Sequence, residues 1–136
     1  MMISRIVLPV VLGMLFLPGV CSGAEARTFD QMNDAELKRI SDVTLAYYLC
    51  ISDRLDTVTD ADKSTPERIL ATYPPYIRIL RQQCRIKLLD VEKELYFLRL
   101  NPEFVTNYVV MLRDDVEHFA LQQVLKKAAA AQAEAK

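Results

Sequence analysis

The sequence predicts an all-α fold, a three-helix bundle with a short extra helix and one disulfide, and three observations support it. All three glycines fall before residue 24, so the rest of the chain lacks the residue that tight turns between strands require. Long stretches place apolar residues every three or four positions, as in a helix with one buried face. Cys50 and Cys84 lie on different predicted helices and can join them.

Residues 1–26 have the pattern of a secretory signal peptide. A short start with Arg5 precedes Ile6–Val20, a run of apolar residues, glycine and proline that is too short for a good membrane span. Small residues suited to a signal peptidase follow, and we expect cleavage after Ala24 or Ala26. The mature protein is then periplasmic or secreted.

Cleavage at either position removes Cys21 and leaves Cys50 and Cys84 as an even pair in an oxidising compartment. We expect a disulfide between them, which stabilises a small domain by about 3–4 kcal/mol in the chain-entropy model. The alternative is a pair of buried thiols. A lipoprotein signal that ends at Cys21 is a second alternative, although Pro18 and Val20 fit its motif poorly.

The mature part is small and nearly neutral. Removing residues 1–24 removes one arginine and no acid, which leaves 16 basic and 18 acidic side chains and a net charge of −2. Such a balance gives no sign of binding to nucleic acid or to an anionic membrane. About 110 residues suffice for one domain, which we place at residues 27–127. Its longest apolar run, Tyr108–Leu112, is far too short to cross a membrane.

Capping residues divide this domain into helices. Helix starts are indicated at Asn33, Thr65 and Asn101, and a proline takes the first helical position after the last two. Pro74 and Pro75 should break a helix, because proline lacks the backbone donor and clashes with the preceding turn. The expected helices cover residues 34–56, 66–72, 75–100 and 102–127.

The short connection at Asn101 makes the last two helices antiparallel. We expect residues 128–136, which are rich in alanine and hold no large apolar side chain, to fray. The predicted facing pairs are Leu98 with Phe104, Leu95 with Tyr108, Val91 with Met111 or Leu112, and Cys84 with His118 and Phe119.

Candidate metal ligands are few. His118 is the only histidine, and it forms an i, i+4 pair with Asp114 at what would be one edge of a metal site. Two ligands on one helix do not make a site, so we interpret His118 as structural. Residues 60–64 resemble the opening of a calcium loop, but Thr65 stands where that loop requires glycine. We therefore expect no metal and no cofactor.

Three arginines follow one face of the predicted helix 75–100, at Arg78, Arg81 and Arg85. Such a row can bind a phosphate or an acidic partner. It can equally form ion pairs with the acidic residues of the next helix, and the predicted layers place Arg85 opposite Glu117. We favour the second interpretation for the row.

The sequence contains no pattern typical of catalysis, because no nucleophile is accompanied by a base and no glycine-rich phosphate loop is present. We therefore expect a non-enzymatic binding protein that acts on another exported or envelope protein, as inhibitors, immunity proteins and chaperone-like accessory proteins do. Self-association into a homo-oligomer is left open. The candidate binding residues are an apolar set and the arginine row: Tyr96, Phe97, Leu100, Val109, Val110, Arg78, Arg81 and Arg85.

An alternative function is a helical-bundle carrier of a cofactor or metal in the periplasm. Helical bundles can hold haem between a histidine and a methionine, and this chain offers His118 with Met32 or Met111. The predicted layers are filled with large side chains, whereas a haem needs a cavity. The sequence thus favours the binding protein.

Overall fold

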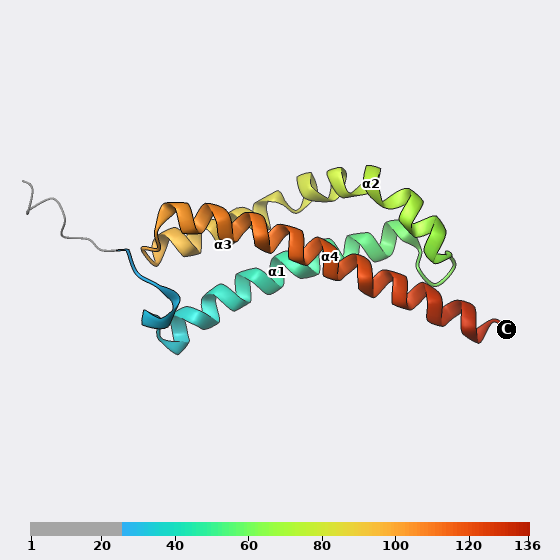
Figure 1. Ribbon diagram of the computed structural model, residues 1–136, viewed down its shortest axis with the longest axis horizontal. Coiled ribbons are helices and arrows are strands. Elements are labelled where there is room, and N and C mark those ends of the chain that lie inside the picture. The colour runs from blue at the N-terminus through green and yellow to red at the C-terminus, as the bar shows by residue number, and fades with distance from the viewer. Residues whose placement is uncertain (1–25) are drawn as a thin grey trace, which may run out of the picture.

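The structure, a computed structural model, describes residues 26–136. The predicted signal peptide lies outside the described residues except for Ala26. A short 3-10 helix, η1, comes first, and four α-helices follow (Figure 1). In the described part of the chain, the β-structure is confined to a single bridge between Arg27 and Leu100. The elements are η1 (Phe29–Gln31), α1 (Asp34–Thr59), α2 (Pro66–Gln83), α3 (Arg85–Phe97) and α4 (Pro102–Glu134).

The predicted helix starts are confirmed. The Asn33 side chain accepts a hydrogen bond from the backbone N–H of Glu36 at 2.9 Å, and the Glu36 carboxylate accepts one from the backbone of Asn33. Thr65 caps α2 in the same way, and Asn101 caps α4. Helix α1 runs three residues past the expected Asp56 and ends where Asp60 adopts a left-handed conformation, at φ 47°.

The predicted break at Pro74 and Pro75 is wrong. Helix α2 runs without interruption from Pro66 to Gln83, through both prolines. Both prolines are exposed, so water can reach the carbonyl groups that lose their helical donors. Ile69 before the prolines and Ile77 after them are both buried, so core packing stabilises each half of the helix.

The predicted single helix 75–100 is also divided, at Cys84. This residue has φ −97° and ψ 4°, so α2 ends before it and α3 begins after it. Cys84 is fully buried and forms the predicted disulfide with Cys50 of α1, with their Cα atoms 5.9 Å apart. Leu80 before the junction and Val91 after it are both buried, so the change of direction lets both helices keep an apolar face in the core.

Side-chain pairs along the helices define their directions. Arg39 of α1 pairs with Glu94 of α3, whereas Arg54, further along α1, bonds to Gln83 of α2. Hence α1 runs antiparallel to α2 and α3. Helix α4 runs parallel to α1, because Tyr48 contacts Phe119 and Asp56, two turns later, pairs with Lys127. Figure 1 accordingly shows an elongated molecule, with the α3–α4 turn near the start of α1.

The core follows the length of the molecule. Its largest fully buried side chains come from all four helices. The largest of these core side chains are Tyr47, Ile51, Leu55, Ile69, Leu80, Leu95, Val91 and Val105.

None of the helices in the described region is both long and apolar enough to cross a membrane.

Helix α4 does not end at Lys127 but continues to Glu134, through the segment that we expected to fray. Ala128 is fully buried, so the first alanine of that segment is a core residue. Alanine has the highest intrinsic helix propensity, and its small side chain permits close approach of a neighbouring helix. The Lys127 ammonium also lies 2.9 Å from the Asp56 carboxylate, which ties this part of α4 to α1.

Candidate functional site

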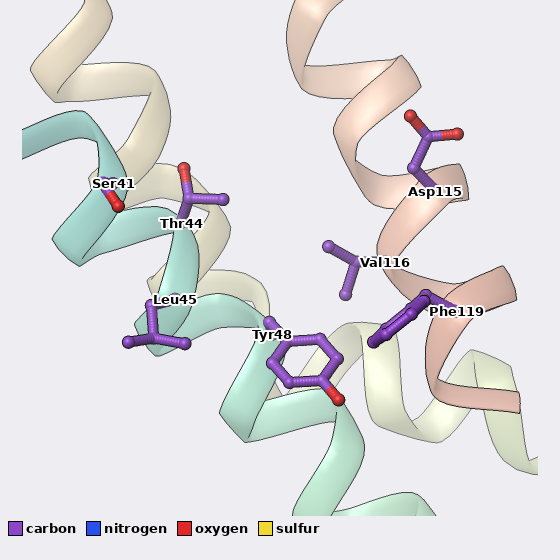
Figure 2. A pocket seen from close by; sticks show the side chains of 7 residues that line it. All are labelled: Ser41, Thr44, Leu45, Tyr48, Asp115, Val116 and Phe119. Carbon is purple, nitrogen blue, oxygen red and sulfur yellow. The ribbon is translucent and has the colours of Figure 1, made fainter. Parts of the chain in front are cut away.

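An apolar groove lies between α1 and α4, with a volume of about 390 Å³. Figure 2 shows that the two helices each contribute one wall, and that the rings of Tyr48 and Phe119 approach each other at one end. The lining residues are Ser41, Thr44, Leu45 and Tyr48 from α1, and Asp115, Val116 and Phe119 from α4.

The groove exposes large apolar side chains. Leu45 is 53 % exposed and Phe119 is 52 % exposed. The Tyr48 and Phe119 ring centroids are 5.6 Å apart with the planes tilted by 52°, an arrangement that holds the Phe119 ring in place. Among the described residues, neither α2 nor α3 contributes to the lining of this groove.

The groove also contains a carboxylate and hydroxyl groups. Asp115 forms no ion pair within residues 26–136. Ser41 and Thr44 add hydroxyl groups to the α1 wall. The groove thus combines apolar walls with hydroxyl groups and one carboxylate. It suits an apolar side chain flanked by a cation that can approach Asp115.

The predicted apolar binding residues are only partly at the surface. Phe97 is 70 % exposed, and Tyr96 and Val110 are also exposed. Leu100, in contrast, is buried, and Val109 is half-buried against the core. Leu100 follows the end of α3, and its backbone pairs with Arg27 in an isolated β-bridge. The structure therefore removes Leu100 from the candidate surface.

The predicted arginine row is split. Arg81, and not Arg85, forms the ion pair with Glu117, through two bonds of 2.7 and 2.8 Å. The expected register was one helical turn off, because the chain changes direction at Cys84. This hydrogen-bonded carboxylate raises the pKa of the Arg81 guanidinium further above its usual range. Arg78 and Arg85 are exposed, and neither forms an ion pair with another described residue.

Tyr47 lies in the core close to this ion pair. Its side chain is 1 % exposed, and its hydroxyl has no hydrogen-bond partner among the described residues. Burial raises the pKa of Tyr47 to about 12, and the negative charge of Glu117 acts in the same direction. Tyr47 therefore stays neutral and contributes as a packing residue.

The residues considered for metal or haem are not brought together. Among the described residues, no group of three or more histidine, cysteine, aspartate or glutamate side chains could hold a metal ion. Asp114 pairs with Arg113, its neighbour in sequence. Met32 is buried, whereas His118 and Met111 are exposed.

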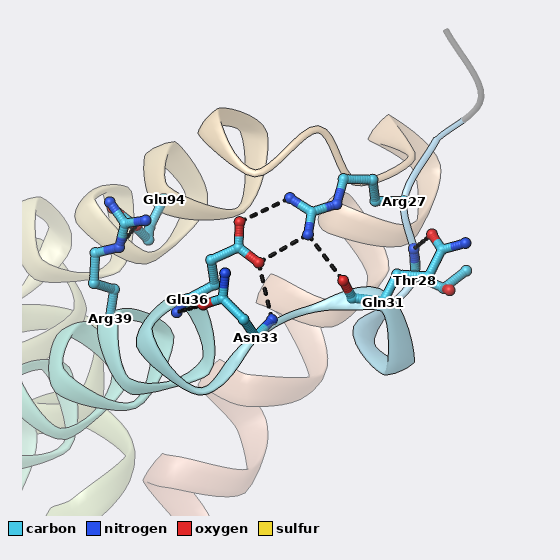
Figure 3. Close-up of polar contacts among 7 residues, drawn as sticks. All are labelled: Arg27, Thr28, Gln31, Asn33, Glu36, Arg39 and Glu94. Atoms are coloured by element: carbon cyan, nitrogen blue, oxygen red, sulfur yellow. Dashed lines mark hydrogen bonds and ion pairs between the residues drawn. The ribbon is translucent and has the colours of Figure 1, made fainter.

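A cluster of hydrogen-bonded polar side chains lies at the N-terminal end of α1 (Figure 3). The Arg27 guanidinium donates to both carboxylate oxygens of Glu36, at 2.9 and 2.8 Å, and to the backbone carbonyl of Gln31. These bonds, together with the one from the Asn33 backbone, lower the pKa of Glu36 to about 2. The cluster fastens the chain before α1 to the bundle, so its role is structural.

The groove itself was missed at the sequence level. Leu45 and Tyr48 were not among the predicted buried or binding residues, and Phe119 was expected to face Cys84 in the core. A signal was available, because Leu45, Tyr48 and Leu49 follow the i, i+3, i+4 spacing of one helical face. Leu45 and Leu49 are both exposed.

Comparisons of the chain with protein-family models, with curated proteins and with solved structures found no match. The function is therefore argued from the geometry of the groove. Its apolar walls and the free carboxylate at its rim are the features that a partner would recognise.

Proposed function

We propose that this protein is a non-enzymatic helical binding protein that acts on another exported protein through the groove between α1 and α4. The observation that carries the proposal is the pair of half-exposed side chains, Leu45 and Phe119, on opposite walls of one groove. Inhibitors, immunity proteins and chaperone-like accessory proteins all work by such contacts, and the proposal covers these three roles.

The groove fits an amphipathic helix or an apolar loop of the partner. Two parallel helices with a trough between them offer the surface on which a third helix can pack its apolar face. Covering a leucine or phenylalanine side chain completely gains about 1.5–3 kcal/mol, so Leu45 and Phe119 can supply the central contacts of an interface. Asp115 at the rim favours a partner segment that carries lysine or arginine beside its apolar residues.

Export supports the choice of partner. The signal-peptide pattern of residues 1–26 and the disulfide between Cys50 and Cys84 both suit an oxidising compartment. A partner must be present in the same compartment, which directs the search to periplasmic, envelope or secreted proteins.

The test is capture from an envelope extract with a photoreactive amino acid placed at Leu45. We expect a specific cross-linked protein, and we expect Phe119→Asp to abolish the cross-link because it places a charge in the apolar groove. Ile86→Asp is the matched control, since Ile86 is an exposed apolar residue on α3, outside the groove. A cross-link that persists in Phe119→Asp, or no cross-link in an extract from the native host, would contradict the proposal.

A further inference from the structure

A second pocket lies at the α1–α2 turn, away from the groove. Its volume is about 190 Å³, and it is bounded by the last turn of α1, by the turn itself and by one face of α2. The α2 wall consists of Arg68, Thr72 and Tyr76, which stand four residues apart and therefore share one face of the helix. Val58, Thr59, Asp60, Lys63 and Ser64 complete the lining.

Some hydrogen-bond donors in this pocket are bonded to backbone carbonyl groups, and others have no partner among the described residues. Ser64 donates its hydroxyl proton to the carbonyl of Thr59 at 2.6 Å, and Thr72 donates to the carbonyl of Arg68 at 3.0 Å. The Arg68 guanidinium and the Tyr76 hydroxyl form no hydrogen bond with another described residue. With the Lys63 ammonium, they leave three donor groups around one small cavity.

The charges around the pocket are positive on balance. Lys63 and Arg68 contribute two cations, and Asp60 is the single acid in the lining. The Lys63 ammonium lies 3.7 Å from the Asp60 carboxylate, and both side chains are mostly exposed, so this ion pair is weak. Asp62, the next acid along the turn, is paired with Lys127 at 3.2 Å.

We propose that this pocket binds a small oxyanion, that is, a phosphate or sulfate group. Arg68 presents two N–H groups to two oxygens of the anion, Lys63 neutralises a second charge, and Tyr76 donates to a third oxygen. The site is independent of the groove, which is lined by residues 41–48 of α1, whereas the pocket begins at Val58. The oxyanion is either a free ion or the headgroup of an anionic lipid, since both offer the same chemistry.

Titration of the full mature protein with inorganic phosphate tests the site, with amide NMR shifts of residues 58–76 as the readout. Arg68→Gln and Tyr76→Phe should each weaken phosphate binding, by at least about tenfold for Arg68→Gln because it removes a charged donor. Asp60→Asn should tighten binding, because it removes the opposing charge and asparagine tolerates the left-handed conformation of that position. Lys87→Gln is the matched control, an exposed cation of α3 outside the pocket, and it should bind phosphate as the unmodified protein does.

A second arm distinguishes the source of the anion. Vesicles of phosphatidylcholine with and without phosphatidylglycerol are tested for co-sedimentation with the same variants. Binding of phosphate alone that depends on Arg68 assigns a free ion, and co-sedimentation that depends on phosphatidylglycerol and on Arg68 assigns a headgroup. The proposal is overturned if neither probe binds, or if Arg68→Gln and Lys87→Gln lose binding equally.

Discussion

Arg81 of α2 binds both carboxylate oxygens of Glu117 on α4, and Glu117 is almost completely buried. The ion pair connects α2 with α4, and these two helices make few other contacts with each other. Glu117 is stable in this position because the guanidinium supplies two charged donors, one for each oxygen. The pair thereby fixes the register of α2 against α4.

Arg81→Met should lower the free energy of unfolding by about 1–3 kcal/mol, because it leaves the Glu117 carboxylate buried without its donors. Urea denaturation measures the change. Arg78→Met is the control, since Arg78 is exposed on the same helix and pairs with no described residue; it should change the free energy by less than about 0.5 kcal/mol. Equal effects of the two substitutions would show that the ion pair contributes nothing specific.

Removing the disulfide should destabilise the protein by about 3–4 kcal/mol, because Cys50 and Cys84 close a loop with a sequence separation of 34. The double substitution Cys50→Ala and Cys84→Ala should therefore unfold at lower temperature than the unmodified oxidised protein. Adding a reductant should destabilise the unmodified protein and leave the double variant unchanged. A reductant effect in the double variant would show that the change arises elsewhere.

The bonds to Glu36 should make stability depend on pH in the acid range. The pKa of Glu36 is about 2 in the folded protein and about 4.5 when unperturbed, so the unfolded chain takes up the proton first as pH falls. The stabilisation is therefore complete above about pH 5 and is lost progressively as pH falls from about 4.5 to about 2.

The measurement compares the unmodified protein with Glu36→Gln by urea denaturation at several pH values. The difference in stability should be constant near neutral pH and should shrink below pH 4.5. Asp42→Asn is a control from an exposed i, i+4 pair on the same helix and should have a small effect throughout. A Glu36→Gln difference that stays constant down to pH 2 would contradict the assignment of the low pKa to Glu36.

Replacing a proline within α2 should stabilise the protein. Pro74→Ala restores a backbone donor in the interior of a continuous helix, and we expect a gain of about 1–3 kcal/mol, which is less than the full helical cost because proline also restricts the unfolded chain. Thermal unfolding measures the gain. If the chain were broken at this position, as the sequence suggests, Pro74→Ala would be neutral or destabilising.

Local signals in the sequence specified where helices begin. The caps at Asn33, Thr65 and Asn101 all function as predicted, because a cap is formed by side chains and backbone groups within three residues of each other. The cysteine count likewise predicted the disulfide, because the expected cleavage after Ala24 or Ala26 would leave one pair and therefore one connectivity. These features need no knowledge of what packs against each helix.

The tertiary structure decided where helices continue, where they bend and which apolar residues stay outside. Helix α2 continues through Pro74 and Pro75, where Ile69 before the prolines and Ile77 after them are buried. The helix ends at Cys84 instead. Leu100 is buried and Phe119 is half-exposed, the reverse of what the helical pattern predicted. Burial depends on partners that are distant in the sequence, whereas a periodic pattern shows only that a helix has an apolar face, and not which part of that face another helix will cover.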